Sequence, residues 1–459
     1  MKLSFAEKAG YGVGALGKDM ACGIVNTFLM FYFTDVVGLA PAFLGVLFMA
    51  ARIWDAINDP MAGWLVDNTR GRMGKFRPWI LAGTLSNTAV LLVLFSNPSI
   101  RGAGQYVFYS VVYILWGMTY TLEDISYWSM IPALADDEAE RNTISVIPRI
   151  FAAAGNVAVG SFGLAVVSAM GKVAPGALPT RAQQATGFFW LAVFIGVAFV
   201  VTNVATVVFV REKVVVRDER KFRFGEIFTT IARNDQLVVI VVAMALYTLA
   251  INLTSSLGIY WFKYDVGDEM LYGTFYLAAG GAQVLAMLLF PAFARRFTRR
   301  NVFILSAVLP IAGYAALYIV GRTVGNNIAL LATAGVVLFF GFGFSLVLTS
   351  VMLADAVDYG EWKLGARSES IVFSMQTFMV KFAMALSGLV TGVGLAAFGF
   401  VANTPQSAGA LTGIRLLMFA VPVVLLAASL AIYLKGYRLN GAYFAEIKEE
   451  LEKRRASHA

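Results

Sequence analysis

The sequence predicts an all-α membrane protein with twelve transmembrane helices in two six-helix bundles. Hydrophobic residues make up 59% of the 459 residues and charged residues 14%, whereas about 25% of an ordinary soluble domain is charged. Many apolar stretches reach the ~20 residues that a helix needs to cross a bilayer. One long charged segment, residues 211–235, separates these stretches into two groups of six. Lipid is therefore the expected solvent of this chain.

The twelve apolar stretches follow one another with short connectors. We expect helices over residues 10–34, 42–66, 77–97, 104–131, 143–170, 184–210, 236–262, 271–294, 301–321, 326–354, 369–399 and 410–435. The expected domains are a first bundle, a linker, a second bundle and a tail, over residues 1–210, 211–235, 236–435 and 436–459. Basic loops follow both the second and the eighth stretch (GWLVDNTRGRMGKFRPW and FARRFTRRN), which favours two bundles related by pseudo-symmetry.

Basic residues are distributed unevenly between the two sets of loops. Most of the 36 lysines and arginines lie in the termini, in the linker and in the loops on the same side. The opposite loops carry only Arg101, Lys172, Arg181, Lys263 and Arg322. Because basic loops stay in the cytoplasm, we expect a multi-pass protein of the bacterial inner (cytoplasmic) membrane with both termini cytoplasmic. No nucleic-acid partner is expected, since the net charge of +8 forms no basic surface interleaved with exposed aromatic residues.

The scarcity of cysteine and histidine excludes several kinds of enzyme site. Cys22 is the single cysteine, and His458, the single histidine, lies in the tail. An internal disulfide, a cysteine-ligated metal cluster and catalysis by a buried histidine are therefore excluded. The sequence also lacks a nucleophile–base pair and a cofactor motif, and we expect no cleavable signal peptide at its N-terminus. We expect no enzymatic activity and no cofactor.

The segment GYGVGALGKDM, residues 10–20, has the spacing of a phosphate-binding loop. Such a loop follows a strand, whereas this segment begins a long apolar helix, and Asp19 stands where a hydroxyl would bind Mg²⁺. The small residues instead share one helix face: Gly10, Gly14, Gly17 and Ala21. Small residues on one face let membrane helices approach closely. We interpret the glycines as a packing stripe and Lys18–Asp19 as a charged pair inside a membrane helix.

Ionisable side chains recur at membrane depth. Each costs about 2.5–3.5 kcal/mol on insertion scales, and such residues usually face the protein interior and have a function. The predicted helices contain Lys18, Asp19, Arg52, Asp55, Asp59, Glu123, Asp124, Arg149 and Lys381.

Two of these carboxylates form a candidate cation site. Asp55 and Asp59 are four residues apart and share a helix face, with Asn58 beside them. Two adjacent carboxylates without a counter-charge repel, so one is forced to take a proton. A bound Na⁺ or Li⁺ relieves this repulsion through oxygen ligands, and a proton can occupy the same site. The alternative is a structural network of salt bridges with Arg52, Arg149 or Lys381.

The fourth predicted helix carries a candidate sugar site. Tyr120, Thr121, Asp124 and Trp128 share a helical face in the segment YTLEDISYW. A carboxylate accepts hydrogen bonds from sugar hydroxyls, and an aromatic ring packs on the C–H face of a sugar. Asp19 supplies a second carboxylate; the alternative for Trp128 is an ordinary interfacial or core aromatic residue. Because Thr121 lies one turn before Asp124, one helix is predicted to contact cation and sugar together.

These residues lie within long motifs that resemble a known family. The motifs are GYGVGALGKD, FTDVVGL, ARIWDAINDPMAGW, GKFRPWIL, YILWGMTYTLEDISYWSMIP, ADAVDYGEWKLG and SMQTFMVK. They resemble the melibiose permease group of the glycoside–pentoside–hexuronide:cation symporters, within the major facilitator superfamily. The resemblance covers essentially the whole chain and implies the major facilitator fold.

The resemblance also implies roles for individual residues. The implied Na⁺/Li⁺/H⁺ ligands are Asp55, Asn58, Asp59 and Thr121. The implied sugar pocket has Asp19 and Asp124 on the galactosyl hydroxyls, completed by Lys18, Tyr120, Trp128 and Arg149, with Gln376 and Thr377 approaching from the eleventh helix. Lys381 matches a lysine near the cation carboxylates. The implied cytoplasmic gating residues are Asp355, Asp358 and Glu361. One departure is Leu346, which stands near the position of a tryptophan in melibiose carriers.

The expected function is symport by alternating access, in which inward Na⁺ (or Li⁺ or H⁺) movement drives uptake of a galactoside such as melibiose. We expect the protein to work as a monomer in the lipid bilayer. The first alternative is a proton-coupled carrier of another glycoside, pentoside or hexuronide. A transport-dead receptor or scaffold and a membrane enzyme are the remaining alternatives.

Overall fold

The computed structural model describes residues 3–69, 71, 73–134, 138–174, 177–212, 233–365 and 369–458. These residues form helices and connectors, and no strand occurs among them. Most of the predicted linker, residues 213–232, lies outside the described residues. The chain divides into two compact units, the first comprising Met1–Asp218 with Gly392–Ser407 and the second Glu219–Thr391 with Ala408–Ala459.

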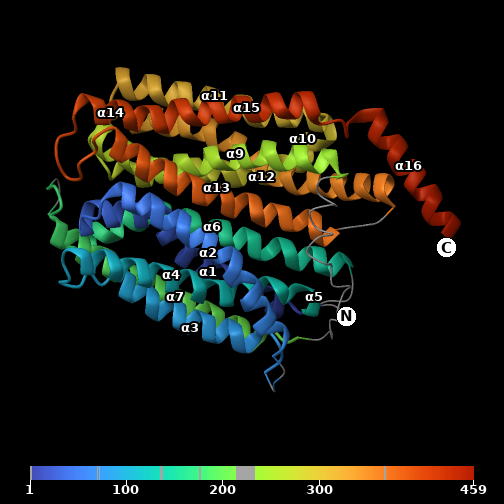
Figure 1. The fold of residues 1–459 in the computed structure, drawn as a ribbon, viewed down its shortest axis with the longest axis horizontal. Helices are drawn as coiled ribbons and strands as arrows, with labels where there is room; N and C mark the ends of the chain where they lie inside the picture. The colour runs from blue at the N-terminus through green and yellow to red at the C-terminus, as the bar shows by residue number, and fades with distance from the viewer. Residues whose placement is uncertain are drawn as a thin grey trace. The chain divides into compact units, whose positions relative to one another are not determined.

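Figure 1 shows the helices of both units. Those that begin in the first unit are α1 (Phe5–Phe31), the π-helical turn η1 (Tyr32–Val37), α2 (Pro41–Asp67), α3 (Arg77–Leu94), α4 (Ala103–Ser129), α5 (Ile131–Leu134), α6 (Glu138–Met170) and α7 (Arg181–Phe209). Those that begin in the second are α9 (Asp235–Trp261), η2 (Phe262–Val266), α10 (Leu271–Arg296), α11 (Arg299–Thr323), α12 (Ile328–Leu364), α13 (Glu369–Ala397), α14 (Ala408–Arg415), η3 (Leu416–Ala420), α15 (Val421–Gly436) and α16 (Gly441–His458).

The predicted apolar stretches all fall on long helices. Ten helical segments of the described chain are long and apolar enough to cross a membrane. The other two, α2 and α4, have 27 residues each. Their mean hydropathy is lower because they carry charged and hydroxyl-bearing side chains, among them Asp55 and Asp124. The helices that deviate most from a lipid-like composition are therefore those of the candidate site.

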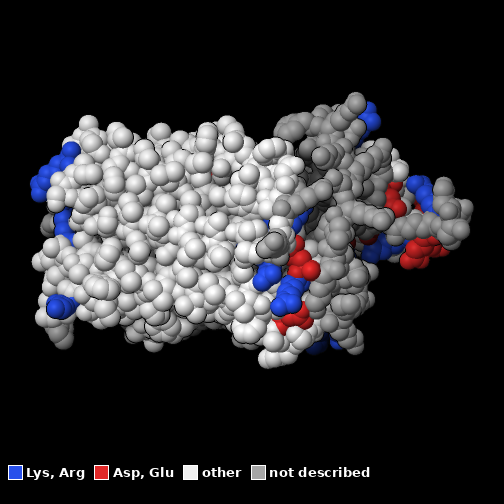
Figure 2. Space-filling view, turned by 90° about the horizontal axis from the view of Figure 1, so that it is seen from below, with Lys and Arg blue, Asp and Glu red and all other residues white. Residues whose placement is uncertain are grey.

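Charged side chains of the described surface gather at the helix ends. On the face shown in Figure 2, lysine, arginine and carboxylate side chains lie towards two ends, and the broad area between them displays none. A hydrocarbon bilayer core of ~30 Å requires such an uncharged band.

The glycines of α1 form a packing stripe, as the sequence predicts, and the structure shows that their partner is α7. A Cβ on Gly10 would lie 3.0 Å from Phe209 Cβ, and one on Gly17 would lie 2.8 Å from the Phe199 Cα. A Cβ on Gly14 would meet the Thr206 hydroxyl group, which donates a hydrogen bond of 2.8 Å to the Gly10 carbonyl oxygen. The small side chains thus allow backbone-level contact between two membrane helices.

Two helical segments extend beyond the predicted limits. Helix α12 continues ten residues past the expected end, and it stops where Gly365 adopts a φ of 72°. The tail forms α16, for which the sequence analysis predicts no helix. The Nε1 atom of Trp362 on α12 donates a hydrogen bond of 2.7 Å to Glu450 on α16. The extension of α12 therefore provides the surface on which the tail helix docks.

The segment Gly392–Ser407 belongs to the first unit by its contacts. A Cβ on Gly392 would lie 2.6 Å from the Gly45 nitrogen, so the backbones of α13 and α2 touch at this point. The Asn403 side-chain amide donates a hydrogen bond of 2.5 Å to the carbonyl oxygen of Asp35. The end of α13 and the loop after it are therefore fixed to the beginning of the chain.

Candidate functional site

A buried ammonium group connects α1 and α4. The Lys18 residue is 2% exposed, and its Nζ lies 2.6 Å from Asp124 Oδ1 and 3.4 Å from Asp19 Oδ2. Nζ also donates a hydrogen bond of 3.3 Å to the Tyr120 hydroxyl. A buried charge is stable only when it is paired and hydrogen-bonded. Both predicted sugar-binding carboxylates are therefore oriented by one lysine.

Aromatic rings surround this ammonium group. Lys18 Nζ lies 5.2 Å from the centroid of the Trp128 ring and 5.5 Å from that of Tyr120. Trp128 Nε1 donates 3.1 Å to Asp124 Oδ1, and the exposed Arg149 guanidinium lies 5.8 Å from the Trp128 ring centroid. The structure thus brings all six predicted sugar-site residues of the first unit into one cluster.

The cluster has one member that the sequence analysis missed. The Nδ2 atom of Asn156 on α6 donates a hydrogen bond of 3.0 Å to Asp19 Oδ1. Its signal in the sequence is weak, since a single asparagine in the small-residue run AAAGNVAVG is also typical of helix packing. A Cβ on Gly23 would lie 3.0 Å from Asn156 Oδ1, so the amide is held in place on both sides.

The predicted cation ligands lie between α2 and α4. Asp55, Asn58 and Thr121 are buried, and Asp59 is half-buried. The Thr121 hydroxyl donates a hydrogen bond of 3.1 Å to Asp59 Oδ1, and this bond joins the two helices. The Asn58 Nδ2 atom is buried without a hydrogen-bond partner among the described residues. Carboxylate, amide and hydroxyl oxygens suit a hard monovalent cation, so this donor set fits the predicted ion.

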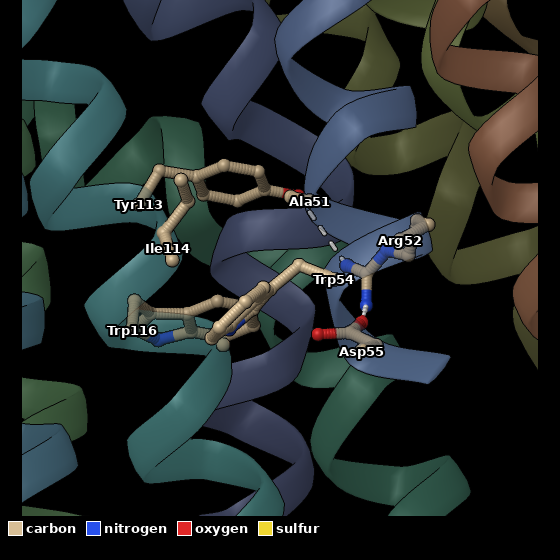
Figure 3. Close-up of a pocket in the computed structure, with 8 residues that line it drawn as sticks. Ala51, Arg52, Trp54, Asp55, Tyr113, Ile114 and Trp116 are labelled. Carbon is tan, nitrogen blue, oxygen red and sulfur yellow. Dashed lines mark hydrogen bonds and ion pairs between the residues drawn. The ribbon is translucent and has the colours of Figure 1, made fainter. Parts of the chain in front are cut away.

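Arg52 forms a salt bridge with one of the two helix carboxylates. Its Nη1 lies 2.7 Å from Asp55 Oδ2, and its Nη2 donates 3.3 Å to the Tyr113 hydroxyl. Figure 3 shows the guanidinium group between these two partners, in a small pocket that Trp116 and Ile114 also line. The alternative of a structural salt bridge thus has support at Asp55, whereas Asp59 has Thr121 as its described donor.

Helix α4 places the two groups of residues on adjacent strips. Tyr120, Asp124 and Trp128 recur every four residues and surround Lys18, while Thr121 faces Asp59. Successive positions on a helix are about 100° apart, so both strips belong to one rigid element. A displacement of α4 would therefore move the sugar-site and cation-site residues together.

Three predicted residues lie on α13, in the second unit. The Gln376 amide donates 3.3 Å to the Ser350 hydroxyl of α12, Thr377 is exposed and Lys381 is half-buried. The Gln376–Ser350 contact lies within the second unit. The part of all three residues in a sugar or cation site stays a prediction.

The predicted gating residues lie on the extended end of α12. Asp355 forms a salt bridge with Arg299 at the beginning of α11 and accepts a hydrogen bond of 3.2 Å from the Tyr437 hydroxyl. Asp358 and Glu361 are half-buried on the same helix. Asp355 thus joins α11, α12 and the segment after α15 within the second unit, and its role in gating stays a prediction.

The described site offers binding groups and no obvious reaction chemistry. Among the described residues, no group of three or more histidine, cysteine, aspartate or glutamate side chains is arranged to hold a metal ion by itself. The clustered groups are an ammonium, carboxylates, amides and aromatic rings, which bind polyols and small cations.

Comparison with known sequences gives matches along nearly the whole chain. A family model described as MFS/sugar transport protein matches residues 10–441. The chain is 31% identical to the isoprimeverose transporter of Lactiplantibacillus pentosus, over 92% of this chain and 86% of that protein. It is 27% identical to the lactose permease of Lactobacillus delbrueckii subsp. bulgaricus, over 98% of this chain and 73% of that protein.

Comparison with solved structures shows the fold. A D-xylose–proton symporter superposes with a TM-score of 0.66 at 12% identity, covering 95% of this chain and 98% of that one. At this identity the likeness concerns the fold alone, and it confirms the predicted all-α membrane architecture.

Proposed function

Because the chain belongs to the MFS/sugar transport protein family, we propose that it is a cation-coupled sugar symporter. The family match confirms the predicted major facilitator fold and the resemblance stated from the motifs. It also places the chain in a family of multi-pass membrane transporters rather than of enzymes. We further propose Na⁺ or Li⁺ as the coupling ion and a galactoside such as melibiose as the sugar.

One observation carries the proposal: the buried Lys18 holds two half-buried carboxylates beside an aromatic ring. Asp19 and Asp124 both contact its ammonium group, and Trp128 lies against it. Carboxylates accept hydrogen bonds from vicinal hydroxyls, and the indole ring offers a flat apolar surface to the C–H groups of a pyranose. We assign the sugar to this cluster, with Tyr120 and Arg149 at its edge and with Gln376 and Thr377 contributing from α13.

We assign the coupling cation to the oxygen atoms between α2 and α4. Asp59 and Thr121 are already in contact, Asn58 precedes Asp59 directly, and Asp55 lies one turn away on α2. A monovalent cation here would neutralise Asp59 and compete with Arg52 for Asp55. Lys381 is proposed as a further basic neighbour of these carboxylates.

Coupling follows if each ligand stabilises the same closed state of the carrier. Helix α4 carries residues of both sites, so the binding of one ligand fixes the helix for the other. A carrier loaded with both then alternates between inward and outward access, with Asp355, Asp358 and Glu361 closing the cytoplasmic side. We also propose that the protein functions as a monomer in the bacterial inner membrane, with both termini cytoplasmic.

Counterflow of a labelled α-galactoside in proteoliposomes tests this function. We expect exchange that is at least about tenfold faster with Na⁺ or Li⁺ than with K⁺, which corresponds to about 1.4 kcal/mol of coupling. A competition panel of unlabelled glycosides, pentosides and hexuronides identifies the preferred sugar. Absence of counterflow and of competition with every galactoside would overturn the galactoside assignment.

The second candidate is a proton-coupled carrier of another glycoside, a pentoside or a hexuronide. The Arg52–Asp55 ion pair favours it, because it engages one of the oxygen ligands that a metal cation needs. This carrier would show no Na⁺ or Li⁺ stimulation and would make the medium alkaline when its sugar is added. A pH electrode in lightly buffered vesicles separates the two candidates.

A further inference from the structure

A side-chain amide of α6 holds one oxygen atom of a candidate sugar carboxylate. Asn156 Nδ2 donates hydrogen bonds of 3.0 Å to Asp19 Oδ1 and of 3.3 Å to the carbonyl oxygen of Ala152. Both hydrogen atoms of the amide therefore have acceptors. The reversed amide would place Asn156 Oδ1 against a carboxylate and a carbonyl oxygen, and acceptors repel one another. The amide thus has one orientation, with its donor towards Asp19.

The α1–α6 interface around this amide is tightly packed. A Cβ on Gly155 would lie 2.6 Å from the Leu16 carbonyl oxygen, so the two backbones touch beside Asn156. A Cβ on Gly23 would lie 3.0 Å from Asn156 Oδ1, so this glycine makes room for the amide. Because close-packed interiors resist displacement, the two backbones fix the position of Asn156 relative to α1.

The other oxygen atom of Asp19 has no hydrogen-bond donor among the described residues. Asp19 Oδ2 is buried and lies 3.4 Å from Lys18 Nζ without a hydrogen bond. The ammonium group donates instead to Asp124 and to the Tyr120 hydroxyl. A buried acceptor without a donor is costly. Asp19 Oδ2 is therefore an atom of the cluster that the hydroxyl group of a ligand would satisfy.

The direction of Asp19 Oδ2 depends on the bond that Asn156 makes. The last torsion of an aspartate is broad and roughly two-fold, so an unheld carboxylate is free to turn. The nearby cation is Lys18, and an unheld Asp19 would turn to hydrogen-bond its ammonium group. The bond from Asn156 keeps Oδ1 engaged on the α6 side and leaves Oδ2 for a ligand.

We propose that Asn156 is a positioning residue of the sugar site that determines specificity through Asp19. By holding Asp19 Oδ1, it directs Oδ2 at one hydroxyl group of the sugar. The fixed direction of this acceptor selects the hydroxyl by its position and its stereochemistry. The inference rests on the proposed function, because it takes Asp19 as a sugar ligand.

Thermal unfolding of the purified full-length protein tests the contact without any sugar. Leucine has about the size of asparagine and no donor, so Asn156→Leu removes the hydrogen bond and keeps the volume. The variant should lower the melting temperature more in the wild-type background than in Asp19→Ala, because residues in contact have non-additive effects. Equal shifts in the two backgrounds would overturn the proposal.

Asn203 on α7 supplies the matched control. It is also a buried amide bonded to α1, since its Nδ2 donates a hydrogen bond of 3.3 Å to the Gly14 carbonyl oxygen. Its second acceptor is the Phe199 carbonyl oxygen, at 3.2 Å. Neither acceptor is a carboxylate of the sugar site. Asn203→Leu should therefore shift the melting temperature equally in the wild-type and Asp19→Ala backgrounds.

Binding of methyl α-galactoside and its monodeoxy analogues tests the role in specificity. In the wild type, loss of the hydroxyl that Asp19 binds should weaken binding at least about tenfold, as expected for a hydrogen bond to a charged group. In Asn156→Leu the ratio of Kd values between that analogue and the parent sugar should fall towards one. Asn203→Leu should keep the wild-type ratio. A wild-type ratio in Asn156→Leu would overturn the proposal, because a merely structural role weakens all analogues alike.

A milder variant decides the question if Asn156→Leu does not fold. Gly23→Ala keeps the amide but displaces Asn156 Oδ1 by a few tenths of an ångström. It should lower the same ratio of Kd values, and an unchanged ratio would overturn the proposal. If the galactoside assignment fails instead, the wild type binds none of these sugars, whereas the unfolding result is unaffected. The deoxy series is then made from the sugar that the competition panel identifies.

Discussion

Lys18 shows how a single residue organises the candidate site. Its ammonium group contacts a carboxylate on its own helix and another on α4, at membrane depth. Removing one partner of a buried ion pair typically costs 3–5 kcal/mol, because the other charge remains unpaired. Substitutions at Lys18 would therefore change stability and binding together. The carboxylates are more informative positions, since each belongs to one proposed ligand.

We expect Asp124→Ala to impair sugar binding and Asp59→Cys to impair the response to Na⁺. Asp124→Ala should weaken galactoside binding at least about tenfold, because a hydrogen bond to a charged group contributes about 1.5–3 kcal/mol. Asp59→Cys should abolish Na⁺ stimulation while keeping measurable sugar binding. Isothermal titration of sugar with and without Na⁺ measures both quantities. Each variant is the control of the other, and normal galactoside binding by Asp124→Ala would show that the sugar site is elsewhere.

At the scale of elements, helix packing depends on where small residues lie. The α1–α7 contact places Gly17 against the backbone of α7, where a Cβ would lie 3.0 Å from the Ala198 carbonyl oxygen. Gly63 on α2 is also helical, but a Cβ there has no neighbouring atom within 4 Å. The two glycines therefore differ only in what surrounds them.

Gly17→Ala should destabilise the protein by about 1–3 kcal/mol, the usual effect of overpacking. Gly63→Ala should be neutral or stabilise by up to about 1 kcal/mol, because alanine has the higher helix propensity. Thermal unfolding in detergent measures both changes. Equal melting temperatures for the two variants would contradict the described α1–α7 packing.

We expect the docking of α16 on α12 to depend on pH. The hydrogen bonds from Trp362 and then from Arg454 lower the pKa of Glu450. The folded pKa thus lies below the ordinary value of about 4.3. The contribution of the carboxylate is present above that value and is lost as pH falls through the lowered pKa.

Glu450→Gln should loosen α16 at neutral pH, and the difference from the wild type should vanish in acid. Hydrogen exchange of α16, compared at equal pH, measures this. The matched control is Glu449→Gln, because Glu449 pairs with Lys453 on the same helix and does not contact α12 through that bond. Equal exchange in both variants would contradict a docking role for Glu450.

At the scale of the whole molecule, the proposed symport requires that the two ligands bind cooperatively. Thermodynamic linkage makes this effect reciprocal. If Na⁺ lowers the Kd for sugar by some factor, sugar must lower the Kd for Na⁺ by the same factor, which we expect to be about 5–150-fold. Titrations of each ligand at several concentrations of the other measure both factors. In Asp59→Cys both of these Kd factors should fall to one. Independent binding of the two ligands to the wild type would contradict the proposed coupling.

The helices were predictable to a large extent, and so were the charged residues that cluster in the candidate site, whose roles stay predictions. Apolar length predicts the membrane-spanning stretches because bilayer thickness imposes it, and charges at membrane depth single out Lys18, Asp55 and Asp124 because their burial is costly. Asn156 was missed because a neutral amide carries no comparable penalty. The tail helix α16 was missed because its stability comes from contacts with α12, through Glu450 and Arg454.

The sequence by itself determined that this protein is a helical, multi-pass membrane protein with ionisable groups inside its helices, because hydropathy and the cost of buried charge act through local composition. Tertiary structure alone decided which charges on different helices meet. It paired Lys18 on α1 with Asp124 on α4, and it left Glu123 beside Gly83 without a hydrogen-bond donor among the described residues. Such pairings depend on how helices distant in the chain pack against one another, and residue spacing within one helix does not say which other helix it meets.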